Sequence, residues 1–252
     1  MRCLLPFCDK FTGLMSVPAL QFTQLRKAYG KSPVLQGIDL AVQPGEFFGL
    51  VGVNGAGKTT LLKCLLDFSE PDSGSIEIFG RSHRQHQARA TLAFVPERFT
   101  PPSYLTGKDF LDYMLRLRGQ AYEPSRVEGM LNALDLDPAA LGKPVRTYSK
   151  GMTQKLGLAA CFLSERPLSL LDEPMSGLDP KARALLKRQL QSLKAQGHTL
   201  FFSSHTLADV EEICDRMAIL HQGILRFAGT PAECCRQFAA ANLEQAFMNC
   251  IA

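Results

Sequence analysis

One stretch of the sequence, residues 52–60, fills the template G-x-x-x-x-G-K-[ST] of a phosphate-binding loop. The apolar run 47–51 before it is typical of a buried strand, and the leucines between 61 and 66 repeat at helical spacing. In a strand–loop–helix unit of this kind, glycines leave backbone N–H groups free to surround phosphate oxygens, and the helix N-terminus adds its positive dipole. We therefore predict that the chain binds a nucleoside triphosphate. The candidate contacts are Gly52, Asn54, Gly55, Ala56, Gly57, Lys58, Thr59 and Thr60.

A second motif predicts what happens at the bound phosphates. In the phosphate loop, Lys58 reaches the β- and γ-phosphates and Thr59 offers a hydroxyl to Mg²⁺. Asp172 and Glu173 follow an apolar strand predicted over 168–171. In phosphate-loop ATPases an aspartate at this place holds Mg²⁺, and a glutamate one residue later can polarise the attacking water as a general base. ATP and Mg²⁺ are the predicted cofactors, with Thr59 and Asp172 at the metal.

Composition argues against two other classes of function. The net charge is only +4, and no block of lysine and arginine stands out, so nucleic acid is not a predicted partner. No apolar run approaches the ~20 residues that span a bilayer, so a membrane role requires a partner chain. The eight cysteines show no metal-ligand spacing and fit core thiols in a reducing cytoplasm.

The order of the predicted elements indicates an α/β chain with an inserted lobe. Strand and turn patterns run from residue 19 to 96, a mostly helical block covers 106–163, and strands alternate with helices after 168. A cap, a first-turn proline and a reciprocal glutamate in 230–233 predict a final helix. Residues 1–16 are expected to be a disordered extension, with Met15 as a candidate for the true start.

The segment 148–152, Tyr-Ser-Lys-Gly-Met, resembles the signature Leu-Ser-Gly-Gly-Gln of the ATP-binding subunits of ABC transporters. The serine and the second glycine agree, and the other three positions differ. The resemblance, which covers about 19–240, implies that Ser149 and Gly151 form an anion site at a helix N-terminus. In the family this site binds the γ-phosphate held by the phosphate loop of a second copy, in a head-to-tail dimer.

The resemblance also implies a fold. It is an α/β phosphate-loop NTPase (RecA-like) core with an N-terminal antiparallel β subdomain and an inserted α-helical subdomain. The implied ATPase domain covers 17–240, with the helical subdomain at about 99–163 and a tail at 241–252.

Three further positions match family motifs, and a fourth departs from one. Tyr29 matches the aromatic residue that stacks on adenine, although a tyrosine at a strand end is also a common surface anchor. Asp179 matches the D-loop that couples the two sites of the dimer, and it can also cap a helix. His205 matches the switch histidine at the γ-phosphate. Glu97 stands where the family normally has the Q-loop glutamine. The resemblance thus implies Glu173, His205 and Glu97 as catalytic residues, and Glu97 as a further Mg²⁺ ligand.

Glu97 and the segment 243–247 (L-E-x-x-F) resemble exporter-type members of the family. The implied function is ATP hydrolysis that drives export through a separate permease, docked near 97–104, from the cytoplasmic face of the membrane. Two alternatives stay open: an importer subunit, and a soluble ABC-type ATPase that acts on nucleic acid or ribosomes. A kinase or other phosphotransferase is disfavoured by the signature. The cargo cannot be predicted, because the membrane subunit selects it.

Overall fold

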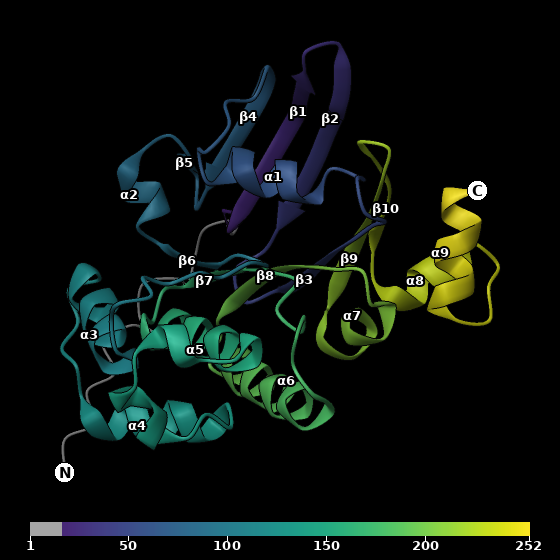
Figure 1. Ribbon diagram of the computed structural model, residues 1–252. Coiled ribbons are helices and arrows are strands. Elements are labelled where there is room, and N and C mark those ends of the chain that lie inside the picture. Colours follow the sequence, from purple (N-terminus) through teal and green to yellow (C-terminus); the bar gives the residue numbers. More distant parts are fainter. Residues whose placement is uncertain (1–16) are drawn as a thin grey trace.

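A computed structural model describes residues 17–252 of the chain, so the extension predicted at 1–16 lies outside the described residues. Its centre is a six-stranded sheet in the order β10-β9-β3-β8-β7-β6 (Figure 1). The strands are parallel except β10, which pairs with β9 in an antiparallel hairpin. β3 and β7 are buried along their whole length, as expected for a parallel sheet covered on both faces. The strands are β3 Phe47–Val51, β6 Leu92–Val95, β7 Leu168–Asp172, β8 Thr199–Ser204, β9 Arg216–His221 and β10 Ile224–Gly229.

A second sheet, antiparallel and four-stranded, lies over one face of the first, with α1 Lys58–Leu65 in the same layer (Figure 1). Its strand order is β2-β1-β4-β5. Leucines of α1 pack with Phe22 of β1 and with Phe48 and Phe201 of the central sheet in one apolar cluster. This cluster holds the phosphate loop against the antiparallel sheet. The strands are β1 Leu20–Tyr29, β2 Ser32–Val42, β4 Ser73–Ile78 and β5 Arg81–Ser82, and the short helix α2 His86–Arg89 follows them.

The helices between residues 107 and 213 cover the opposite face of the central sheet (Figure 1). The first of them begins at the predicted cap, where Thr106 and Asp109 form a reciprocal capping box. The predicted cap of α6 is also present, because Asp179 accepts a hydrogen bond from the Ala182 N–H at 2.9 Å. These helices are α3 Gly107–Leu117, α4 Pro124–Ala133, α5 Lys150–Leu163, α6 Pro180–Ala195 and α7 Leu207–Ile213. The α/β core, the antiparallel β subdomain and the helical subdomain of the predicted fold class are therefore all present.

The C-terminal end corrects one expectation. The helix predicted at 230–233 is α8 Pro231–Gln237, with its capping box between Thr230 and Glu233. It is not the last helix, because α9 Leu243–Ile251 follows, capped by Asn242. Leu243 and Ala246 of α9 are fully buried against the hairpin and α7, so this segment packs as part of the fold. Within residues 17–252, none of the helices combines the length and apolar character needed to cross a bilayer.

Candidate functional site

The phosphate loop connects β3 to α1, and its backbone is one that only glycine supports. Gly55 and Gly57 have φ angles of 83° and 113°, in the left-handed region. A Cβ atom at Gly57 would lie 2.9 Å from the Val34 carbonyl oxygen, and one at Gly52 would collide with the Leu220 carbonyl. α1 has no side-chain cap at its N-terminus. The N–H groups of its first turn therefore have no partner in the helix and can bind phosphate oxygens.

Lys58 is held inside this loop. Its side chain is buried, and Nζ donates to the Gly52 carbonyl at 2.6 Å and to the Val53 carbonyl at 3.4 Å. Burial lowers the pKa of Lys58, while the carboxylates of Glu173, Asp172 and Glu97 oppose that shift. The ammonium is bonded to neutral carbonyls in a partly desolvated site, so an anion that enters the loop gains a strong electrostatic contact.

Asp172 ends β7 and is tied to the neighbouring strand. It faces Ser203 in the parallel register of β7 and β8, and Ser203 Oγ donates a hydrogen bond to Asp172 Oδ1. Burial raises the pKa of Asp172, as do the nearby carboxylates of Glu173 and Glu97, whereas Ser203 and Lys58 lower it. A cation bound beside this buried carboxylate would favour its charged form. We did not single out Ser203 from the sequence, although its place at the end of a predicted strand was the available signal.

Glu173 adopts a strained backbone that aims its side chain at the switch histidine. Its φ angle is 49°, a conformation that costs a non-glycine residue about 1–2 kcal/mol. The Glu173 N–H donates to Ser203 Oγ at 3.1 Å, which holds the turn. Oε2 of Glu173 lies 2.8 Å from Nδ1 of His205, whose side chain is 63% exposed. The structure thus brings the predicted general base and the predicted γ-phosphate sensor into direct contact.

A cavity of about 280 Å³ joins the predicted nucleotide residues. Tyr29, which is half exposed, lies at one side, and Glu97, Asp172 and Glu173 lie with the phosphate loop. The Tyr29 hydroxyl contacts Ser69 Oγ at 3.4 Å, and Lys27 Nζ lies 5.5 Å from the ring centroid. The lining is Tyr29, Val34, Val53, Asn54, Gly55, Ala56, Gly57, Lys58, Thr59, Thr60, Glu97, Asp172 and Glu173.

The oxygen atoms around this cavity suit Mg²⁺. Thr59 offers an exposed hydroxyl, and Asp172 and Glu97 offer carboxylates. In the described part of the chain, no cluster of three or more His, Cys, Asp or Glu side chains is arranged to hold a metal by itself. Mg²⁺ is commonly held by one or two protein oxygens together with substrate phosphates. The donor set therefore fits a cation that arrives with the nucleotide.

The signature residues lie elsewhere. Ser149 is exposed and caps α5, since its hydroxyl accepts a hydrogen bond from the Met152 N–H at 3.2 Å. A Cβ atom at Gly151 would lie 3.3 Å from the Gly177 carbonyl, and Lys150 Nζ lies 3.4 Å from Ser176 Oγ. The signature segment therefore packs against Ser176 and Gly177, just before Asp179 in the same chain, and none of its residues lines the phosphate-loop cavity.

Comparison with known proteins agrees with this geometry. The family model described as ABC transporter matches residues 35–176, more than half of the chain. An uncharacterized ABC transporter ATP-binding protein of Synechocystis is 43% identical over 79% of this chain, and the match spans 57% of that protein's length. The Nod factor export ATP-binding protein I of Ralstonia nicotianae is 35% identical over 88% of this chain and 70% of its own.

A solved structure of an ATP-binding subunit of an ABC transporter superposes with a TM-score of 0.82 at 32% identity. The superposition covers 92% of this chain and 99% of the other. The chain therefore belongs to the ABC transporter family, as one of its ATP-binding proteins, whose nucleotide-binding domain hydrolyses ATP.

Proposed function

We propose that the chain is the ATPase subunit of an exporter, and that it works through a separate membrane permease. The observation that carries the proposal is that the phosphate-loop cavity and the exposed signature serine lie apart on one chain. The cavity holds the phosphate loop and the carboxylates, whereas Ser149 stands exposed at the N-terminus of α5. Export is supported by Glu97 in place of glutamine and by the relatives named Nod factor export ATP-binding protein I.

In this proposal two copies meet head to tail. The phosphate loop of each copy binds ATP, and Ser149 and Gly151 of the other copy complete the γ-phosphate side. ATP shifts the equilibrium toward the closed dimer because it gains contacts there that the open form lacks. Asp179 lies at the start of α6 beside the signature, so closure brings the D-loop to the partner's site.

Each residue has a role that its surroundings support. Lys58 and the helix N-terminus bind the phosphates, Tyr29 offers its ring to the adenine, and Thr59, Asp172 and Glu97 hold Mg²⁺ with the phosphates. Glu173 accepts the proton of the attacking water, while His205, 2.8 Å from the Glu173 carboxylate, orients that carboxylate and contacts the γ-phosphate. Mg²⁺ supplies charge stabilisation at the transferred phosphoryl group.

The permease is proposed to dock between the core and the helical subdomain. A cavity of about 580 Å³ lies there, lined by residues 97–101 and 103 together with side chains from 145 to 154. Tyr104 beside it is 79% exposed. Because Glu97 lines both this cavity and the nucleotide cavity, it connects the docking site to the phosphates. The subunit would lie at the cytoplasmic face of the membrane.

The first test is Glu173→Gln, which keeps the size of the side chain but removes the base. We expect ATP binding to persist, turnover to fall about 10²- to 10⁴-fold, and an ATP-loaded dimer to accumulate. Turnover is measured by phosphate release, and the dimer by light scattering after gel filtration. The control is Glu70→Gln, at an exposed ion pair with Arg84, where activity should not change. Near-normal turnover in Glu173→Gln would exclude Glu173 as the base.

A further inference from the structure

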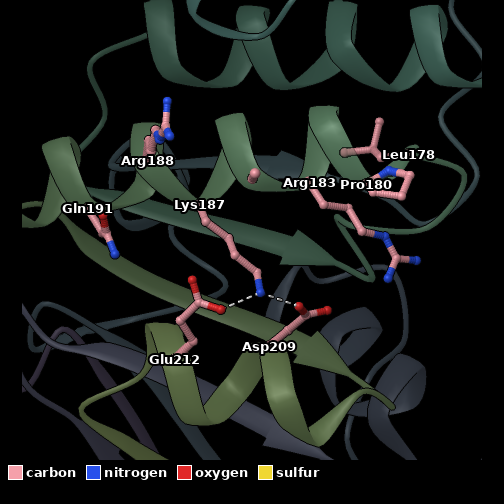
Figure 2. Close-up of a pocket in the computed structure, with 9 residues that line it drawn as sticks. Leu178, Pro180, Arg183, Lys187, Arg188, Gln191, Asp209 and Glu212 are labelled. Carbon is pink, nitrogen blue, oxygen red and sulfur yellow. Dashed lines mark hydrogen bonds and ion pairs between the residues drawn. The ribbon is translucent and has the colours of Figure 1, made fainter.

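A cleft of about 730 Å³ lies between α6 and α7, outside the nucleotide cavity. Figure 2 shows Lys187 of α6 reaching across it and ending between Asp209 and Glu212 of α7. Lys187 Nζ lies 2.9 Å from Asp209 Oδ1 and 2.6 Å from Glu212 Oε2. One lysine therefore joins the two helices through two ion pairs.

The Lys187–Asp209 pair of this junction is mostly shielded from water, whereas the Glu212 side chain is half exposed. The side chains of Lys187 and Asp209 are 17% and 5% exposed. Oδ2 of Asp209 is buried without a hydrogen-bond partner. Within residues 17–252, the only ion pair of this carboxylate is the one between its Oδ1 and Lys187. Burial opposes the charge on Lys187, but its hydrogen bonds to Glu212 and Asp209 prevail and raise its pKa. Removing the lysine would leave a buried carboxylate unpaired, which is strongly destabilising at that point.

The two joined helices each begin close to a residue of the proposed site. α6 is capped by Asp179, and Lys187 lies eight residues farther on, about 12 Å along the helix. α7 begins two residues after His205, and Asp209 lies in its first turn. Thr206, the first residue before α7, makes no side-chain cap, and the helix has only seven residues. Its N-terminal end therefore depends on tertiary contacts for its position.

The same pair of helices carries a second ion pair at its far end. Lys194, seven residues after Lys187 and so on the same face of α6, lies 2.6 Å from Asp215 just beyond α7. Lys194 and Asp215 are more exposed, at 36% and 43%, and they lie at the end of α7 away from His205. This pair connects α6 to the segment after α7, where Asp215 also accepts a hydrogen bond from the Phe47 N–H, and it does not hold the start of α7.

We propose that Lys187 is a positioning residue for ATP hydrolysis: by fixing the first turn of α7 to α6, it sets His205 in register with Asp179 and Glu173. The inference rests on the roles proposed above for His205 and Asp179. Because Glu173 Oε2 contacts His205 Nδ1, a shift of α7 changes the direction of the general base as well. Misplacements of about 1 Å at a reacting group can cost up to ~10²-fold in rate.

The test compares Lys187→Met with Lys194→Met in the full chain. Each variant loses one lysine of α6; Lys187→Met also loses two ion pairs and Lys194→Met loses one. Melting temperature is measured for both. At a temperature where both are folded, we expect Lys187→Met to lower kcat about tenfold with KM for ATP nearly unchanged, since the phosphate loop is untouched. Lys194→Met should keep kcat near the wild-type value. Lys187→Arg should recover most of kcat, because a guanidinium can still bridge both carboxylates.

Equal kcat in Lys187→Met and Lys194→Met would overturn the inference. If Lys187→Met does not fold, Asp209→Asn is compared with Asp215→Asn, and the same order of kcat is expected; equal values overturn it. His205→Ala separates the two levels of the argument. Wild-type turnover in His205→Ala would overturn the proposed role of His205 itself. An inactive His205→Ala with a fully active Lys187→Met would overturn only the positioning role.

Discussion

The phosphate loop and the signature both lie at the N-terminus of a helix, but they differ in how far the rest of the chain buries them. At α1 the inner part of the glycine loop is buried at Ala56, Gly57 and Lys58, and a cavity lies in front of it. At α5 the end of the helix is exposed, and the Ser149 hydroxyl bonds to the helix's own Met152 N–H. A partly buried loop with a cavity in front of it can bind an anion alone, whereas an exposed helix N-terminus needs a second surface to exclude water. The difference is what the proposed head-to-tail dimer would use.

The largest expected effect is at the phosphate loop. Lys58→Met keeps the length of the side chain but removes the charge that faces the phosphates. We expect ATP affinity to fall about 10- to 100-fold, the loss of one charge-assisted contact, and ATPase activity to be lost. Titration with a fluorescent nucleotide measures the affinity. Lys63→Met, on the exposed face of the same helix, is the control and should bind normally. Unchanged ATP affinity in Lys58→Met would mean that the phosphate loop is not the ATP-binding site.

Mixing two inactive chains tests whether the exposed end acts on a second copy. Ser149→Ala should also lose most activity, because one donor at developing phosphate charge is worth up to ~10²-fold. In a mixture with Lys58→Met, each heterodimer has one site with both Lys58 and Ser149 intact. Random pairing then restores up to about a quarter of wild-type activity. No recovery, when gel filtration shows that heterodimers form, would mean that the signature does not act across the dimer.

The sequence predicted the parts of the site that depend on local pattern. The phosphate loop, the carboxylates after β7 and the helix starts at Thr106, Asp179 and Thr230 each follow from a few neighbouring residues. The contact between Glu173 and His205 could not be predicted, because it needs the register of β7 beside β8 and a left-handed φ at Glu173. Register and backbone strain are properties of the assembled sheet.

Contacts between charged residues far apart in the sequence could not be predicted either. Lys187, Asp209 and Glu212 appear in the sequence as three charges on two amphipathic helices, and only the packing of α6 on α7 brings them together and buries Lys187 and Asp209. α9 was missed as a packed helix because the resemblance assigned residues 241–252 to a tail. In both cases tertiary contact decides the role of the residue, and a single sequence does not specify that contact.

The smallest expected effect is at Tyr148, which anchors the first residue of the signature to the helical subdomain. Its hydroxyl donates to the Ala140 carbonyl at 2.8 Å, and its ring packs against Gly107 at the start of α3. Tyr148→Phe should cost about 1 kcal/mol, or about 2–4 °C in melting temperature, because the Ala140 carbonyl loses its partner. Tyr113→Phe, on the exposed side of α3, should leave the melting temperature unchanged.

ATP affinity of the isolated chain should be the same in Tyr148→Phe and in the wild type, since Tyr148 does not line the nucleotide cavity. Weaker binding in Tyr148→Phe would show that the loop at α1 and the signature at α5 communicate within one chain. The phosphate loop and the signature would then not act separately within one chain. The signature could affect nucleotide binding in its own chain as well as in the proposed second copy.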